Sequence, residues 1–135
     1  MALFLFTKAI LDGRPINVFN NGEMKRDFTY IDDIVQGTIA AIDLGAPCEI
    51  FNLGNNNPIE LGTLIELLEE ALGKKAEKEM LPMQQGEVIE TYADIEKSSK
   101  LLNFRPSVSL EEGIYHFIDW FKAYHPSSSL HSIIA

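Results

Sequence analysis

Hydrophobic positions along much of the chain recur with the period of an α-helix, about every three to four residues. Three of the segments concerned are followed at once by a glycine, Gly13, Gly45 or Gly73, the residue type that most often ends a helix. The expected helices are 2–12, 33–44, 61–72, a short segment from Asp94 to about residue 102, and 110–124.

The first expected helix, 2–12, is unusual because apolar residues cover most of its circumference. Leu3, Phe6 and Ile10 share one face, while Phe4 and Leu5 extend the apolar surface around the cylinder. A helix of this kind is normally buried on most sides. Two explanations stay open from the pattern alone: a partner surface that covers the helix, or a central place in the core.

Strand patterns alternate with the helices. Strands are expected over 16–19, 25–31, 49–53 and 75–81, the last as a half-exposed edge strand rich in charge. Asn20-Asn21-Gly22 lies between the first two and predicts a hairpin, because Asn and Gly tolerate the positive φ of tight turns. The mixture predicts an α/β or α+β fold, with one domain over 1–124 and a frayed, flexible C-terminal tail over 125–135.

Capping residues mark the starts of several helices. Ser109 and Glu112 form a capping box three residues apart, which places the start of the last helix. Asp32 is positioned to cap the helix over 33–44. The adjacent carboxylates of Asp32 and Asp33 could in principle serve acid–base chemistry, but the positive N-terminal end of a helix accounts for both charges, and capping is the preferred interpretation.

Composition restricts the class of protein. The 135 residues carry 20 acidic and 11 basic side chains, a formal net charge of −9, which disfavours a nucleic-acid partner. The single Cys48 excludes an intrachain disulfide and fits a cytoplasmic protein. The apolar opening 1–6 is too short to span a membrane and lacks a leader's basic start and cleavage site. We therefore expect neither a membrane nor a nucleic acid as partner.

Four motifs, in family order and spacing over residues 1–124, resemble the C-terminal region of extended short-chain dehydrogenase/reductase enzymes acting on nucleotide sugars, and most of all the UDP-glucuronate 4-epimerases. They are Arg26-Asp27-Phe28-Thr29-Tyr30-Ile31-Asp32-Asp33-Ile34, Phe51-Asn52-Leu53-Gly54, the run from Gln84, Gly86, Glu87 and Val88 through Thr91-Tyr92-Ala93-Asp94 to Lys97, Phe104 and Pro106, and Ser109-Leu110-Glu111-Glu112-Gly113-Ile114 with Phe117 and Trp120.

The resemblance implies an isomerase in which NAD removes hydride from C4 of a UDP-sugar, the keto sugar rotates, and hydride returns to its other face. In the family, a glycine-rich loop holds NAD and a Tyr-x-x-x-Lys pair moves the proton. Neither motif occurs in this sequence: no tyrosine has a lysine four residues later, and no two of the nine glycines are three residues apart. We expect the missing N-terminal Rossmann half to precede Met1, and this chain alone neither to bind NAD tightly nor to turn over substrate.

Arg26 is the candidate for binding the substrate's diphosphate. A guanidinium offers a planar fork that matches phosphate oxygens, and the family counterpart contacts the diphosphate. The alternative is a surface ion pair of Arg26 with Asp27 or Glu23, which would contribute little.

Two further segments complete the candidate site through the resemblance. Asn17, Val18 and Phe19 match a strand beside the nucleotide base, although core packing explains Phe19 equally well. Gln84, Gly86 and Glu87 match a loop that closes over the nucleotide, or form an ordinary loop. Many relatives have Arg, Pro and Asp at positions 84, 85 and 87; Gln at 84 is frequent in UDP-glucuronate epimerases.

Three hypotheses follow. The chain is the substrate-binding part of an NAD-dependent nucleotide-sugar epimerase, a free-standing sugar-nucleotide binding module, or a structural remnant that self-associates through helix 2–12 as a homo-oligomer. Activity regained on adding the Rossmann half would favour the first, and nucleotide binding without such a gain the second. A dehydratase or decarboxylase stays an alternative reaction for the longer protein.

Overall fold

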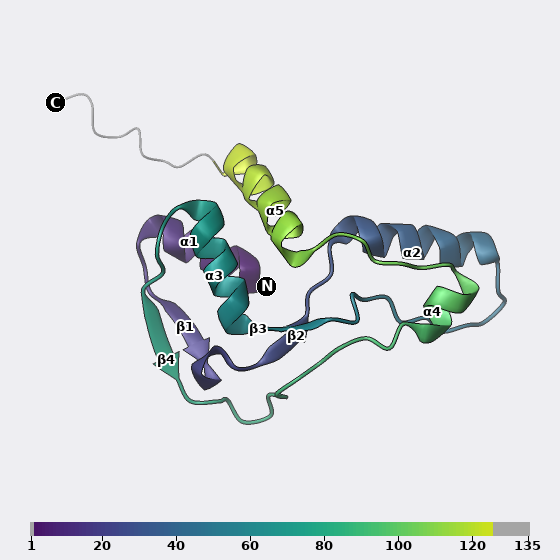
Figure 1. Cartoon of the computed structure of the whole chain (residues 1–135), viewed down its shortest axis with the longest axis horizontal. Helices are drawn as coiled ribbons and strands as arrows, with labels where there is room; N and C mark the ends of the chain where they lie inside the picture. The colour runs from purple at the N-terminus through teal and green to yellow at the C-terminus, as the bar shows by residue number, and fades with distance from the viewer. Residues whose placement is uncertain (1, 126–135) are drawn as a thin grey trace.

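A computed structural model describes residues 2–125 and shows an elongated molecule with two unequal ends (Figure 1). Helices α1, α3 and α5 gather at one end with strands β1 and β4, while α2 and α4 lie at the other. The elements in order are α1 (Ala2–Asp12), β1 (Ile16–Phe19), a 3-10 turn (Asn20–Gly22), β2 (Lys25–Asp27), α2 (Ile31–Leu44), β3 (Pro58–Glu60), α3 (Leu61–Leu72), β4 (Lys78–Leu81), α4 (Glu96–Leu101) and α5 (Leu110–Tyr124).

The strands form two separate two-stranded sheets rather than the predicted hairpin. β1 pairs in parallel with β4, and β2 pairs antiparallel with β3. Asn20, Asn21 and Gly22 all have positive φ, as predicted for a turn, but they close a 3-10 turn that leads away from β1. The hairpin prediction is therefore wrong, because a tight turn fixes the local backbone and not the partner of the strand that follows it.

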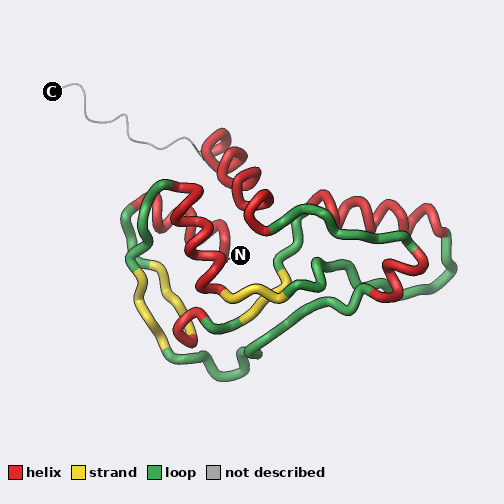
Figure 2. The backbone as a smooth tube through the Cα atoms, viewed as in Figure 1, coloured by secondary structure: helices red, strands yellow, loops and turns green. Residues whose placement is uncertain are grey.

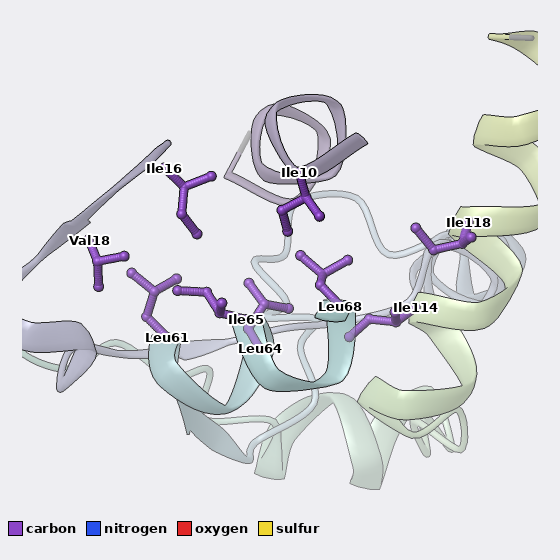
Figure 3. Close-up of a cluster of buried hydrophobic side chains, with 9 residues drawn as sticks. All are labelled: Ile10, Ile16, Val18, Leu61, Leu64, Ile65, Leu68, Ile114 and Ile118. Carbon is purple, nitrogen blue, oxygen red and sulfur yellow. The ribbon is translucent and has the colours of Figure 1, made fainter. Parts of the chain in front are cut away.

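The hydrophobic core lies between α1, β1, α3 and α5 (Figure 3). The helix predicted over 110–124 is confirmed as α5, which buries Ile114, Ile118 and Phe121 against the core. Helix α1 buries only Thr7 and Ile10 completely, and its other apolar side chains range from half-buried to exposed. The residues of the main cluster are Ile10, Ile16, Val18, Leu61, Leu64, Ile65, Leu68, Ile114 and Ile118.

Helix α2 presents its apolar stripe outward. The large side chains on this stripe are exposed, and the buried positions of the helix are Asp33 and Gly37. The Cα of Gly37 faces Leu53 and Phe104, so closely that a Cβ there would come within 2.7 and 2.8 Å of their side chains. We call the exposed set the α2 stripe; it consists of Ile31, Val35, Ile39 and Ile42.

The strand predicted over 49–53 does not form in the structure, where residues 49–57 have no regular secondary structure. Ile50 within it is 81% exposed. A strand needs a hydrogen-bonding neighbour, and none of the described strands pairs with this segment. The strand predicted over 25–31 also shortens to Lys25–Asp27, because α2 already begins at Ile31.

Of the helix caps expected from the sequence, the structure confirms the one at α5. Ser109 is the N-cap of α5, and its hydroxyl accepts from the Glu112 N–H at 3.1 Å. At α4 the N-cap residue is Ile95, while the carboxylate of Asp94, the residue before it, accepts from the Glu96 N–H at 3.0 Å. At α2 the N-cap residue is Tyr30 rather than Asp32. Of the predicted tail, only His125 lies within the described residues.

Gly37→Ala is expected to destabilise the chain by about 1–2 kcal/mol, because overpacking against the buried Phe104 ring outweighs the better helix propensity of alanine. Gly62→Ala in α3 is the matched control. Its new Cβ would meet nothing nearer than the Gly22 carbonyl oxygen at 3.7 Å, so it should be neutral or stabilising. Urea unfolding of both variants gives the comparison, and equal effects would contradict a close contact at Gly37.

Candidate functional site

Arg26 lies on β2, and its guanidinium is held from two directions. Nη1 donates to the Lys25 carbonyl oxygen at 2.8 Å and to the Ile89 carbonyl oxygen at 3.4 Å. Nη2 lies 3.0 Å from Glu87 Oε2, and the side chain of Arg26 is 28% exposed. The structure therefore gives Arg26 an ion pair across 61 positions of sequence, not the local pair with Asp27 or Glu23 that the sequence left open as the alternative.

Glu87 belongs to the long loop between β4 and α4, which runs along one side of the molecule (Figure 2). The loop turns at Gln84, whose carbonyl oxygen accepts from the Glu87 N–H at 3.2 Å. Gly86 has a φ of 90°, a backbone conformation that side-chain-bearing residues rarely adopt. Arg26 and the 84–87 loop, predicted separately, are thus brought together by the fold.

The segment 17–19 reaches this loop through β4. Asn17, Val18 and Phe19 pair with Glu79, Met80 and Leu81, the residues that lead into the loop. Val18 is 1% exposed and belongs to the core, so its side chain is not available to a ligand. Asn17 is exposed and Phe19 half-buried.

Asp27, next to Arg26, organises two other loops and was not singled out from the sequence. Its carboxylate accepts from the N–H groups of Asn55 at 3.1 Å, Asn56 at 3.0 Å and Ala93 at 3.0 Å. Gly54 lies so close that a Cβ there would come within 2.8 Å of Asp27 Oδ2. An acidic residue inside the strand expected over 25–31 was the available signal, because such residues are depleted from strands.

A cavity of about 450 Å³ adjoins Asp27. Its walls come from β2, from the irregular segment 51–54 and from the end of the long loop, and they combine backbone groups with an aromatic ring at Phe51. Tyr92, another wall residue, is 61% exposed. The full lining is Asp27, Thr29, Phe51, Asn52, Leu53, Gly54, Thr91, Tyr92 and Ala93.

A second cavity of about 670 Å³ lies at the turn between α3 and β4, remote from Arg26 in the sequence. Lysines and glutamates line it in equal number, so it offers no net charge to a ligand. Its lining is Glu66, Glu69, Glu70, Gly73, Lys74, Lys75 and Lys78. Within residues 2–125 no group of three or more His, Cys, Asp and Glu side chains is placed to hold a metal ion, and no helix has the length and apolar content to cross a membrane.

Comparisons with known proteins relate this chain to one family of enzymes. Residues 1–54 match the NAD dependent epimerase/dehydratase family. A protein of Methanocaldococcus jannaschii without an established function is 54% identical over 121 residues, and the UDP-glucuronate 4-epimerase of Thermodesulfobacterium geofontis is 48% identical over 124 residues. Each alignment covers 90% of this chain but only 37% and 38% of the relative, so the chain spans under two fifths of their length.

Solved structures point to the same group of enzymes as the sequence relatives do. The UDP-glucuronic acid 4-epimerase of Bacillus cereus, crystallised with UDP-glucuronic acid and NAD, superposes with a TM-score of 0.83 at 37% identity, over 92% of this chain and 40% of that one. These matches confirm the predicted mixed α/β fold and the predicted resemblance. The chain therefore resembles part of the extended short-chain dehydrogenase/reductase nucleotide-sugar epimerases, with UDP-glucuronate 4-epimerases among its relatives.

Proposed function

We propose that residues 1–124 form the substrate-binding lobe of an NAD-dependent UDP-sugar epimerase of the UDP-glucuronate 4-epimerase type, with Arg26 as the diphosphate ligand. The observation that carries the proposal is the position of Arg26, a partly exposed guanidinium in contact with the loop 84–87. The similar Bacillus cereus enzyme was crystallised with UDP-glucuronic acid, which supports the same class of ligand here.

The chemistry of the ligand suits this arrangement. A sugar diphosphate carries about two negative charges, and a chain with a net charge of −9 must offset them with a local cation. Arg26 supplies that cation. The exposed Asn17 and the backbone of 17–19 would lie along the nucleotide base, and Gln84, Gly86 and Glu87 would cover it. The buried side chain of Val18 limits that residue to backbone contacts.

The described residues do not fit NAD. The glycines of the described residues lie at least eight positions apart, whereas a dinucleotide loop needs several closely spaced glycines at a helix N-terminus. We therefore assign NAD and the chemical steps of epimerisation to the remainder of a longer protein. The chain alone is expected to bind the sugar nucleotide and not to convert it.

The exposed apolar side chains support the proposal that this chain associates with a partner that covers them. Ile39 and Ile42 of the α2 stripe are 53% and 71% exposed, and Ile50 is 81% exposed. Burying one such side chain contributes roughly 1.5–3 kcal/mol, so together they favour association. The Rossmann half is the partner that we propose; self-association is the alternative, and sedimentation of the isolated chain distinguishes it as a concentration-dependent oligomer.

An amide-resolved NMR titration with UDP-glucuronate tests the proposal. Shifts are expected at Arg26, at 17–19 and at 84–87, and Arg26→Ala should weaken binding at least about tenfold, as loss of a charge-assisted contact predicts. Arg14→Ala is the matched control, because Arg14 is exposed and, among residues 2–125, its side chain pairs only with the nearby Asp12. Binding that survives Arg26→Ala, or shifts elsewhere in the molecule, would refute the assignment of Arg26.

A further inference from the structure

We propose that Glu87 is a specificity-determining residue that occupies the Arg26 guanidinium until a diphosphate displaces it. The inference rests on the proposed function of Arg26 and adds a role for the loop that covers it. Glu87 would thus set the charge that a ligand must carry to enter the site.

The guanidinium does not need Glu87 for its orientation. Nη1 is already fixed by two backbone carbonyl oxygens, those of Lys25 and Ile89. Lys25 itself is anchored, since its N–H donates to the Ile89 carbonyl oxygen at 2.8 Å and its own carbonyl oxygen accepts from the Thr91 N–H at 3.2 Å. Removing the Glu87 carboxylate would therefore leave Arg26 in place.

The main effect of Glu87 on Arg26 is electrostatic. Its Oε2 lies 3.0 Å from Nη2, and the two side chains are 38% and 28% exposed, so the pair is partly shielded from water. A carboxylate at this distance cancels most of the attraction that Arg26 would exert on an incoming anion. It also repels a phosphate that approaches the same nitrogen.

Glu87 is in addition the side chain that fastens the first part of the loop. Residues 89–91 are held to β2 by backbone hydrogen bonds. Ahead of them, the turn at 84–87 contains Gly86 and is joined to β2 by the side chain of Glu87. When an anion binds Arg26, the turn at 84–87 loses the ion pair that joins it to β2.

The consequence is selectivity for charge. A nucleoside without phosphate brings no charge to compete with the carboxylate and gains nothing from Arg26. A nucleoside diphosphate brings enough charge to replace Glu87. The carboxylate therefore lowers the affinity for every anion, and it excludes weakly charged ligands from the guanidinium.

Calorimetric titrations with UDP, inorganic pyrophosphate and uridine test this in the wild type, Glu87→Gln, Arg26→Ala and Glu90→Gln. Glu87→Gln should bind UDP and pyrophosphate roughly three- to fivefold more tightly, as the release of a partly exposed ion pair predicts, and uridine unchanged. Glu90→Gln removes the same charge from the same loop at an exposed position, and it should bind as the wild type does. Arg26→Ala should no longer bind UDP or pyrophosphate.

A second measurement needs no ligand. Amide hydrogen exchange at residues 84–88 should accelerate in Glu87→Gln and in Arg26→Ala, and not in Glu90→Gln. Unchanged exchange would overturn the fastening role. UDP binding that is equal or weaker in Glu87→Gln, while Arg26→Ala still loses it, would overturn the competition and leave the diphosphate site intact. The proposed function itself would be refuted by UDP binding that is unchanged in Arg26→Ala. It would also be refuted if neither the wild type nor any variant bound UDP.

Discussion

Replacing Glu69 with glutamine is expected to lower the free energy of unfolding at neutral pH by about 3 kcal/mol. Glu69 lies on α3, and its side chain is only 4% exposed. Its carboxylate accepts from Lys75 Nζ at 2.7 Å and from the Ala76 N–H at 3.1 Å, and it lies 3.0 Å from Lys78 Nζ. These contacts tie the start of β4 to α3, so their loss loosens the sheet that β4 shares with β1.

The effect of Glu69 should depend on pH. Burial by itself would raise the pKa of Glu69, but hydrogen bonds from Lys75, Lys78 and the Ala76 N–H outweigh it and lower the pKa from 4.5 to about 2. A carboxyl group with a depressed pKa in the folded state stabilises the protein fully above its pKa in the unfolded state. The contribution of Glu69 is therefore present above about pH 4.5 and is lost as the pH falls toward 2.

Urea unfolding between pH 7 and pH 2 measures this dependence. The difference in stability between the wild type and Glu69→Gln should shrink as the pH falls below 4.5. Glu70→Gln is the matched control, since Glu70 is the next residue on the same helix and its side chain is exposed. A difference between the wild type and Glu69→Gln that stays constant down to pH 2 would contradict the lowered pKa.

Helices were predictable here because their information is local. Gly45 and Gly73 end α2 and α3 with φ of 61° and 64°, as their place after the apolar stripes predicted. Ser109 caps α5 through a contact only three residues away. In each case, the residues that decide the structure lie within one turn of each other.

Pairing of strands was not predictable because it depends on distant residues. β1 finds its partner in β4, about 60 positions later, and no residue near the turn at 20–22 signals this. The segment 49–53 carries an apolar strand pattern without a partner among the described strands.

Periodicity also does not say which way a stripe faces. Val35 and Ile39 form as regular a stripe as Leu64 and Leu68, yet the first pair is exposed and the second buried. In the candidate site, too, some features can be predicted from local sequence and others depend on distant residues. Arg26 was predicted as a ligand from its charge, its chemistry and its family counterpart. Its ion pair with Glu87, and the hydrogen bonds of Asp27 with the backbone at 55–57 and 93, can be seen only in the folded chain.

Asp33→Ala is expected to destabilise the chain by about 3 kcal/mol, because it removes a buried charged acceptor from two partly buried N–H groups. Asp33 is 3% exposed in the first turn of α2. Its carboxylate accepts from the Ser107 N–H at 3.0 Å and from the Val108 N–H at 3.1 Å. It therefore does not serve acid–base chemistry with Asp32, nor does it cap its own helix through these contacts; it binds α2 to the segment that leads into α5.

Asp32→Ala provides the control for this interpretation, because Asp32 is exposed and occupies the same helix turn. Loss of its charge should remove only the interaction with the helix dipole, about 0.5 kcal/mol. Thermal and urea unfolding of both variants gives the two values. Asp33→Asn should recover part of the loss, since an amide oxygen still accepts one N–H. Equal effects of Asp32→Ala and Asp33→Ala would mean that the helix dipole, and not the tie to 107–108, is what Asp33 contributes.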